Sequence, residues 1–350
     1  MQMVNAGDRL AMLRPGIPGQ PGVDVYGNEI PFKPPKPIML PHGKNTYESP
    51  DGLNLFSEIN GQIVFEGDQK INVSPVFHVK ENVDFSTGNI RFNGSVVVHG
   101  NVNAGFLIEA DGNIEVMGIV EAADLKAQGD IIIRGGIQGS TTTRIIAGGA
   151  IRALYLQNAV VNAVGAVVVS DSVMNSVVQA DEVRVAGKRG LLVGGLMRVQ
   201  KGLFARVLGS HMGARTRIEL FFYKQINESL HALEVKQAEK MQDIAKIEEV
   251  LGKLQQLLAL RKTLTMEQME NRDRLVETLN VERQVIQSLT NEYKELTNKK
   301  QYAAPPFVEI GSVAYPGVTI STGSEIIELD EILHNSKFIH DESGLHRVVQ

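Results

Sequence analysis

Apolar and polar residues alternate in short runs through the middle of the chain, from about residue 83 to residue 209. In Ile114-Glu115-Val116 and in Val183-Arg184-Val185 the outer residues are apolar and the middle one is charged. Because successive side chains of a β-strand point to opposite faces, each run predicts a strand with one buried and one solvated face. Glycine, asparagine or aspartate precedes many of the runs and can supply the bend between strands.

The runs recur at a regular spacing. The stretches 108–116, 125–133 and 161–169 are cognate, and 145–153 and 178–185 are looser copies. Their equivalent positions are Ile114, Ile131, Ile151, Val167 and Val183. The period of roughly 16 to 20 residues is typical of stacked repeat architectures. Strands that return once per repeat would stack about 4.8 Å apart, so the pattern predicts a parallel β-helix.

Two kinds of β-helix compete. The left-handed kind built on hexapeptides, which is typical of acyltransferases, agrees with the six-residue steps from Ile108 to Ile114 and from Leu125 to Ile131. The variable period disagrees with strict hexapeptides, and parallel crossover connections are overwhelmingly right-handed. We therefore favour a right-handed parallel β-helix.

After Gly209 the apolar spacing changes from two residues to three and four. The first set is Ile244, Ile247, Leu251, Leu254 and Leu258; the second is Leu275, Leu279, Ile286, Leu289, Tyr293 and Leu296, with Glu282 in one core position. These spacings predict coiled-coil helices. Thr265 and Gln268 have the form of a capping box at the start of the second helix. We expect a long antiparallel coiled-coil hairpin whose second helix spans roughly 50 Å.

The predicted organisation therefore has four parts. Residues 1–80 hold ten of the 13 prolines, which is typical of a linker, although 59–65 and 71–73 predict paired strands of a small β module. Residues 81–210 form the parallel β-helix and residues 211–302 form a coiled-coil helical hairpin insertion. Residues 303–350 supply C-terminal β-strands that return to the β-helix, since Pro305 and Pro306 end the helix.

Composition narrows the class of protein. Aromatic residues make up only 5% of the chain and tryptophan is absent, as expected for a narrow β-helix core. The net charge of −5 disfavours generic nucleic-acid binding. The absence of cysteine excludes disulfides and thiolate metal sites and mildly favours a cytoplasmic location. We find no signal peptide at residues 1–8 and no apolar segment long enough to cross a bilayer.

A run of basic residues without an intervening acid contrasts with the acidic chain. It comprises Arg184, Lys188, Arg189, Arg198, Lys201, Arg206, Arg215 and Arg217. If outward positions of successive turns align, these side chains would form a basic face for a phosphate or an acidic partner. The first six are our candidate binding residues. The alternative is a solvated face neutralised by the acidic helices that follow.

No constellation of residues predicts catalysis. Asp111, Asp130, Asp171 and Asp181 fall mostly at bends, where aspartate has a turn role. His99 has no recognisable partner for work as a base. His334, His340 and His346 recur every six residues beside Asp341 and Glu342, a step that does not suit one helix face. We predict no catalytic residues, no metal and no cofactor; a β-helix carbohydrate-active or acyl-transfer enzyme is the alternative.

Several stretches, in their order along the chain, resemble the flagellar assembly protein A family (FapA), long known only as a domain of unknown function. They are 7–11, 18–27, 83–96, 129–137, 187–195 and 315–318. The resemblance covers nearly the whole chain. It implies a bacterial cytoplasmic protein concerned with flagellar assembly or its placement, and it offers no catalytic residues to transfer.

The favoured function is a non-enzymatic scaffold. The β-helix would be a rigid shaft and the hairpin an arm that reaches a protein partner of the flagellar or cell-pole machinery. A signalling protein that couples metabolic state to motility is one conceivable partner. An open end of the β-helix or the basic face would serve self-association into a homo-oligomer, or peripheral contact with the inner face of the membrane at the cell pole.

Overall fold

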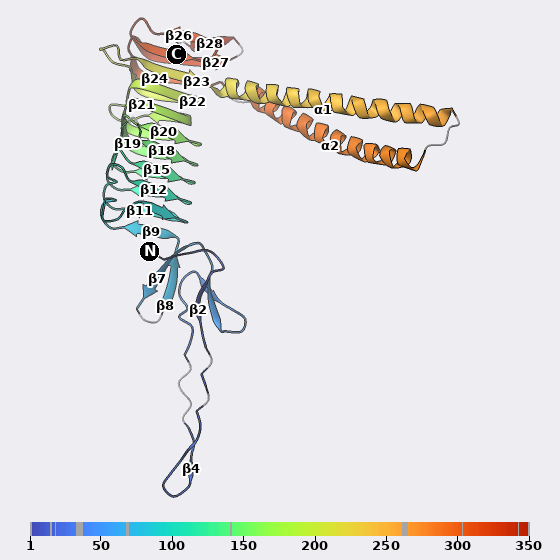
Figure 1. Ribbon diagram of the computed structural model, residues 1–350. Helices are drawn as coiled ribbons and strands as arrows, with labels where there is room; N and C mark the ends of the chain where they lie inside the picture. Colours follow the sequence, from blue (N-terminus) through green and yellow to red (C-terminus); the bar gives the residue numbers. More distant parts are fainter. Residues whose placement is uncertain are drawn as a thin grey trace.

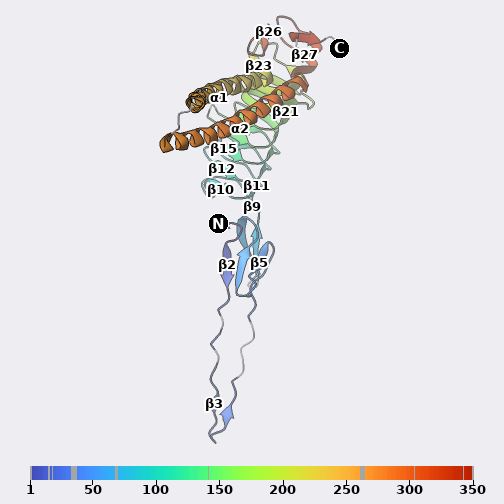
Figure 2. The same ribbon diagram turned by 90° about the vertical axis from the view of Figure 1, so that its right-hand side faces the viewer.

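The computed structural model describes residues 2–14, 16–17, 19–32, 38–67, 70–140, 142–260, 265–302, 304–341 and 343–348. The chain is mainly β, with a β-solenoid of about eight turns and two helices. The solenoid is an upright stack of strands, and the helices leave it sideways near its C-terminal end (Figure 1). The N-terminal residues lie beyond the opposite end and send a thin projection away from the stack (Figure 2).

Each solenoid turn contributes strands to three faces, which we name A, B and C. Face A contains β10 (Ile90–Phe92), β12 (Leu107–Ala110), β15 (Asp124–Ala127), β18 (Arg144–Ala147), β20 (Val160–Ala163), β23 (Thr216–Leu220) and β25 (Val318–Ser321). Face B contains β9 (Val76–Val79), β11 (Ser95–Val98), β13 (Ile114–Val116), β16 (Ile131–Ile133) and the start of β24 (Phe307–Ala314). Face C contains β14 (Val120–Glu121) and β17 (Ile137–Gln138). The longer strands β19 (Ile151–Gln157), β21 (Val167–Val185) and β22 (Leu191–Leu208) bend from one face to the next.

The register of face B confirms the repeat predicted from the sequence. Ile114 lies opposite Ile131, Ile131 opposite Ile151, and Ile151 opposite Val167. Val183 continues the column and lies opposite Leu203 in the following turn. All of these side chains are fully buried. Branched aliphatic residues thus stack on their equivalents in adjacent turns, and this column is the centre of the core.

Polar residues at the corners bond the backbone of the next turn. The Asn113 backbone N–H donates to Ser95 Oγ at 3.0 Å, and the Asp130 N–H donates to Asn113 Oδ1 at 2.8 Å. The Ala150 N–H then donates to Asp130 Oδ1 at 2.7 Å. These bonds satisfy donors that the strand ladders leave over at each bend. The turn role predicted for Asp130 is therefore confirmed.

Close stacking also explains why glycine occupies a corner at residue 187. A Cβ on Gly187 would overlap the backbone carbonyl oxygen of Ser170 in the preceding turn, and backbone cannot move aside cheaply. We expect Gly187→Ala to lower the free energy of unfolding by about 2 kcal/mol or more. Gly252→Ala is the matched control, because a Cβ there meets nothing within 4 Å inside a helix and alanine gains about 1 kcal/mol of helix propensity. Chemical denaturation measures both; equal effects would show that the corner is not tightly stacked.

The helices interrupt the solenoid at a single corner between faces A and B. In one turn Gln200 and Lys201 alone connect the face A pairing to the face B pairing. In the next turn the same corner holds residues 221–306, which include α1 (Phe222–Ala259) and α2 (Met266–Tyr302). On either side of the insertion the register continues, since Val199 lies opposite Leu220 and Gly202 opposite Phe307. The predicted bounds of the solenoid, residues 81 and 210, are therefore both exceeded. The first solenoid strand begins at Val76, and the stacked strands continue after residue 210.

The C-terminal strands cover one end of the solenoid. β24 and β25 pair in parallel with β22 and β23. β26 (Ile326–Glu328) then pairs antiparallel with β25, β27 (Leu333–Asp341) with β24, and β28 (Gly344–Val348) with β27. Reversal of the strand direction ends the stack and covers strand edges that would otherwise invite association.

The N-terminal residues form small sheets of their own. β1 (Met3–Val4), β7 (Gly61–Glu66) and β8 (Lys70–Ser74) make one sheet, and β2 (Arg9–Met12), β6 (Asn54–Ser57) and β5 (Thr46–Glu48) make another. The antiparallel pairing of β7 with β8 confirms the strands predicted at 59–65 and 71–73. β3 (Gly22–Val23) and β4 (Glu29–Ile30) pair near the end of the projection.

Candidate interaction surfaces

The six candidate basic residues lie on more than one face of the solenoid. Arg198 belongs to face A, between Gln179 and Glu219, whereas Arg184 belongs to face B, opposite Phe204. Lys201 lies at the corner between these faces. Lys188, Arg189 and Arg206 come together at the corner beyond face B, where Arg206 Nη1 donates to the Lys188 carbonyl oxygen at 3.0 Å. The structure therefore gathers three of the six and separates the others.

Four of these basic side chains are bonded to carboxylates. Arg184 contacts Glu182, Arg189 contacts Asp171, Arg198 contacts Glu219 and Lys201 contacts Asp181. Hydrogen bonds from the Arg189 guanidinium hold the pKa of Asp171 below its ordinary value. The hydrogen bond to Asp181 raises the pKa of Lys201. Only Lys188 and Arg206, within the described part of the chain, have no carboxylate partner.

The histidines form no metal cluster. His334 lies opposite Val313, and His346 lies opposite Ile339 on the other side of β27. His346 Nδ1 is 3.7 Å from Asp341 Oδ1, and Glu342 lies outside the described residues. No group of three or more His, Cys, Asp or Glu side chains that could hold a metal ion occurs in the described ranges.

His99 has a partner that sequence reasoning missed. His78 Nδ1 lies 3.4 Å from His99 Nε2, and the rings are stacked with their centroids 5.6 Å apart. The two residues are 21 positions apart, close to one solenoid period. In the sequence, this spacing of about one period was the only sign that the two histidines would be neighbours. Both side chains are exposed, so the pair decorates the surface of the first turns.

The four aspartates considered as catalytic groups are bonded to neighbouring turns. Their partners are Gln128 for Asp111, Ala150 for Asp130, Arg189 for Asp171 and Lys201 for Asp181. Each carboxylate thus takes part in turn-to-turn bonding.

The two helices form an arm that projects from the solenoid, and their facing side chains follow a heptad spacing. Asn227 bonds Lys300, Glu234 bonds Tyr293 and Gln237 contacts Thr290, so the partner numbers fall along α2 as they rise along α1. The half-buried or buried positions of α1 include Ile226, Leu230, Leu233, Gln237, Lys240, Ile244, Ile247, Leu251 and Leu254. Those of α2 include Leu275, Leu279, Glu282, Ile286, Leu289, Tyr293 and Leu296. Leu258 is the exception among the predicted positions, since it is 43% exposed near the end of the arm.

The capping box predicted at the start of α2 is confirmed. The Gln268 N–H donates to Thr265 Oγ1 at 3.2 Å, and the Thr265 N–H donates to Gln268 Oε1 at 3.0 Å. Both bonds satisfy donors that the first turn of a helix leaves without a backbone acceptor.

A polar layer interrupts the apolar seam of the arm. Lys240 Nζ donates to Glu282 Oε1 at 2.9 Å, and the Glu282 side chain is only 18% exposed. Glu282 Oε2 is buried and has no hydrogen-bond partner. The hydrogen bond to Glu282 raises the pKa of Lys240. A charged pair at seam positions favours one alignment of the helices, because a shifted register would bury each charge against leucine.

We expect Lys240→Leu to lower the melting temperature of the arm, because it leaves the Glu282 carboxylate half-buried without its cation. The double variant Lys240→Leu/Glu282→Leu should melt a few degrees higher than the single variant, since leucine can fill both seam positions. Thermal unfolding followed by helical circular dichroism measures both. Lys253→Leu, which removes an exposed pair with Glu249, should change little; an equal loss there would mean that the Lys240 pair has no special role.

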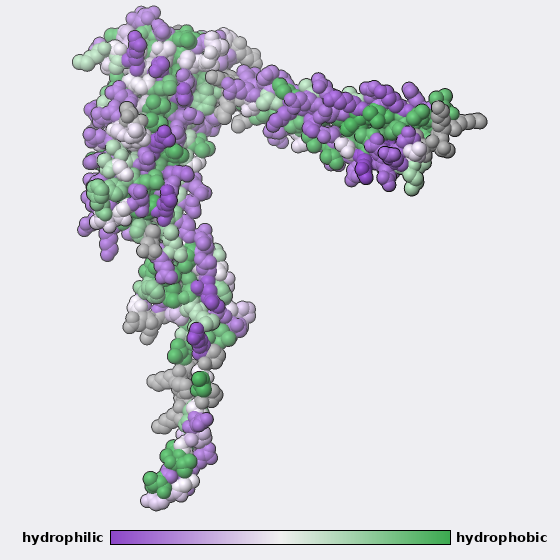
Figure 3. Space-filling view, viewed as in Figure 1, coloured by the Kyte–Doolittle hydropathy of each residue, from purple (hydrophilic) through white to green (hydrophobic). Residues whose placement is uncertain are grey.

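Apolar side chains are exposed along the N-terminal projection. Residues 19–32, which we name the finger, expose Val23, Val25, Tyr26, Ile30 and Phe32. Figure 3 shows green hydrophobic residues at the end of the finger and on the outer part of the arm, while hydrophilic residues cover much of the visible solenoid. The sequence analysis predicted a linker here, because this part of the chain is rich in proline. The only sign of this apolar surface in the sequence was the recurrence of apolar residues between the prolines.

The fold and its surfaces define a class of protein: a β-solenoid that carries an inserted helical arm and, in its described part, no metal-binding cluster. Neither helix has an apolar stretch that could span a membrane, within the residues described.

The chain belongs to the flagellar assembly protein A family. Residues 75–345 match the model of the Flagellar Assembly Protein A beta solenoid domain, and residues 1–68 match that of the Flagellar Assembly Protein A N-terminal region. No curated protein and no solved structure matches the chain. The family is one of flagellar assembly proteins and is not a known enzyme family.

Proposed function

We propose that this protein is a non-enzymatic scaffold that acts in bacterial flagellar assembly or in its polar placement. It works through protein contacts made by the solenoid and by the arm. The partners belong to the flagellar or cell-pole machinery, and a metabolic signalling protein is one of them. The site of action is the cytoplasm, at the cell pole or at the inner face of the membrane.

The observation that carries the proposal is the place of the arm. Two residues, Gln200 and Lys201, suffice to turn the corner in one coil, and residues 221–306 turn it in the next with no change of register. The stacked strands therefore do not need the arm in order to align. At about 1.5 Å per residue the 38 residues of α1 extend roughly 57 Å. An arm of this length is suited to contact another molecule.

The same proposal includes the finer architecture. The solenoid is right-handed, as parallel crossovers are in nearly all proteins. The arm is an antiparallel coiled coil, which the falling order of its contacts supports. The domain division is a Pro/Gly-rich N-terminal part, the solenoid, the arm and the returning C-terminal strands.

The test is a complementation experiment in a flagellated bacterium that encodes the protein. A deletion strain receives a fluorescent fusion of the full chain, or the same fusion with residues 221–306 replaced by Gln-Lys. The full chain should give a polar or membrane-associated focus and restore flagella, while the shortened chain, at equal abundance, should give diffuse fluorescence and few flagella. Normal flagella in the deletion strain would overturn the proposal. Full rescue by the shortened chain would show that the arm has no part in the proposed function.

A further inference from the structure

An extended loop, residues 186–190, turns one corner between faces B and C. Val185 is the last residue paired on face B and Leu191 is the first paired on face C, so five residues connect them. In the other parallel turns of the solenoid this corner takes one to three residues, and in the next turn Arg206 alone suffices. The stacked strands therefore align without a loop of this length.

The loop is anchored to both neighbouring turns. Toward the preceding turn, the Arg189 guanidinium donates to Asp171 Oδ1 at 2.9 Å. From the following turn, the Arg206 backbone N–H donates to the Gly190 carbonyl oxygen at 3.0 Å. The Arg206 side chain also donates, through Nη1, to the Lys188 carbonyl oxygen at 3.0 Å. A loop that is held in this way loses little conformational entropy when a ligand binds.

The backbone of the loop has unused donors. The N–H groups of residues 187–190 have no hydrogen-bond acceptor within the described ranges of the chain. At the same corner of other turns, the Gly118 N–H donates to the Gly100 carbonyl and the Gly135 N–H to the Gly118 carbonyl, each at 3.1 Å. Gly190 takes a left-handed φ of +54°. Consecutive N–H groups at a turn of this kind form a concave binding site for an anion.

The side chains around these donors are mainly basic. Lys188, Arg189 and Arg206 come together with one carboxylate, that of Asp171, so the group has two positive charges in excess. Lys188 and Arg206 are exposed, and neither has a carboxylate partner in the part of the chain that the structure describes. An ammonium and a guanidinium group are the side chains that most often bind phosphate oxygens.

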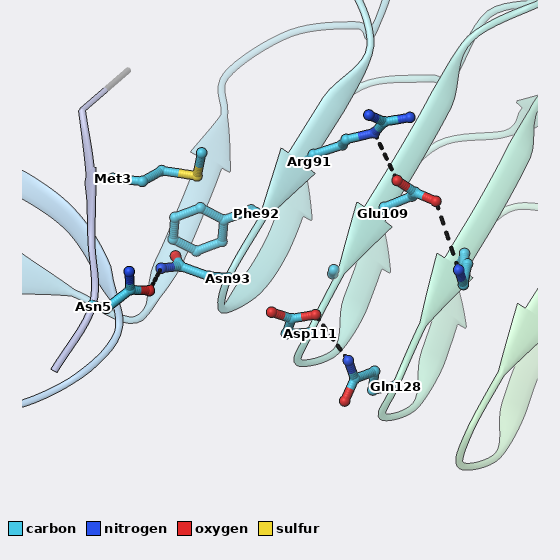
Figure 4. A pocket seen from close by; sticks show the side chains of 10 residues that line it. Met3, Asn5, Arg91, Phe92, Asn93, Glu109, Asp111 and Gln128 are labelled. Atoms are coloured by element: carbon cyan, nitrogen blue, oxygen red, sulfur yellow. Dashed lines mark hydrogen bonds and ion pairs between the residues drawn. The ribbon is translucent and has the colours of Figure 1, made fainter.

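The cavity at the N-terminal end of face A has no such excess of charge. Its volume is about 420 Å³, and the charged residues that line it are Arg91, Lys126, Glu109 and Asp111. Arg91 and Lys126 both contact the Glu109 carboxylate, at 2.7 and 3.8 Å (Figure 4). Because two carboxylates balance two cations, this cavity does not favour an anion.

We propose that the loop of residues 186–190, together with Arg206, binds a phosphate group. Lys188 and Arg206 compensate its charge, which is −1.5 to −2 at about pH 7, and the N–H groups of the loop donate to its oxygens. A single phosphate group fits better than a broad anionic surface, because membrane binding takes clusters of about four to eight basic residues. The inference goes beyond the proposed function, since a scaffold can act without a small ligand.

Isothermal titration calorimetry of the full chain with inorganic phosphate tests the site. Binding should be saturable, and Lys188→Glu should weaken it by about tenfold or more, since a carboxylate replaces a cation beside the ligand. Lys80→Glu is the matched control, because Lys80 is an exposed lysine at the same corner of the first turn; its phosphate affinity should stay that of the full chain. Absence of saturable binding, or equal weakening in both variants, would overturn the proposal.

A shortened loop tests the part played by the backbone. Residues 186–190 are replaced by Ser-Asp, because Ser170 and Asp171 turn the same corner in the preceding turn. The shortened chain should melt within a few degrees of the full chain and should no longer bind inorganic phosphate. A folded shortened chain that binds phosphate as the full chain does would refute the assignment of the site.

Sedimentation with vesicles of phosphatidylcholine and phosphatidic acid identifies the source of the phosphate group. Sedimentation of the full chain that Lys188→Glu abolishes would assign the group to a lipid headgroup. A full chain that binds inorganic phosphate but stays in solution beside the vesicles would assign it to a soluble phosphorylated molecule.

Discussion

Ile131→Asp should abolish cooperative folding of the solenoid. Ile131 is fully buried on face B between Ile114 and Ile151, so the variant loses an aliphatic contact with both neighbouring turns. It also places a carboxylate in the core without a cation or a hydrogen-bond donor to pair with it. Loss of a buried aliphatic side chain costs roughly 2–5 kcal/mol, and burial of an unpaired polar group adds several more. That total is comparable to the whole stability of a typical domain, about 5–15 kcal/mol.

The adjacent residue supplies the control for this prediction. Ile132 lies in the same strand but faces outward, opposite Glu115 and Arg152. Ile132→Asp should therefore change the unfolding free energy by less than about 1 kcal/mol. Urea unfolding followed by far-ultraviolet circular dichroism and by light scattering distinguishes the two variants. If both variants folded equally well, or both failed, the assignment of inward and outward positions would be wrong.

The column from Ile114 to Val183 could be predicted from sequence for a physical reason. Each turn repeats the same local sequence pattern, an apolar triplet after a bend, so a buried strand recurs at equivalent positions. The spacing of the repeats varies because loops at the corners tolerate insertion, while the buried positions do not. The helical arm could be predicted equally well, since a heptad pattern is local and Thr265 with Gln268 marks the start of α2.

The ion pairs of the basic residues could not be predicted in the same way. Arg189 bonds Asp171, and Lys201 bonds Asp181, so in each case the partner lies one solenoid turn earlier in the sequence. A basic run without acids in the sequence is therefore not a basic surface in the fold. Predicting the pairs requires the number of residues in every turn, and the repeat gives that number only within a few residues.

The finger shows a different limit of sequence reasoning. The proline and glycine content of residues 15–37 is typical of a linker, and composition carries no information about where apolar side chains such as Val25 and Tyr26 point. The turn that exposes them depends on Asp24, whose side chain replaces missing backbone bonds. That bonding is local, so the Asp24-Val25-Tyr26-Gly27-Asn28 run was a readable turn signal, but the exposure of its apolar residues was not.

Excision of the arm should leave a folded solenoid. The replacement is taken from the preceding turn: residues 221–306 are removed, and Gln-Lys joins Leu220 to Phe307, because Val199 and Gly202, opposite them, are joined in that way. We expect helical circular dichroism to disappear while the β signal remains. The melting temperature of the β signal should fall by no more than a few degrees, since a loss of 1 kcal/mol shifts a domain of this size by about 2–4 °C.

A second excision makes the outcome decisive. Removal of residues 216–306, which takes out β23 as well, leaves the face A strand of β22 without its partner and places β25 one turn out of alignment. Each turn of a solenoid is stabilised mainly by its neighbours, so this variant should lose cooperative unfolding although it lacks only five more residues. If the shorter excision also unfolded the chain, the arm would be a structural brace, and its projection would need another explanation than binding. If only the longer excision did so, stability would lie in the stacked strands and the arm would be free to serve a partner.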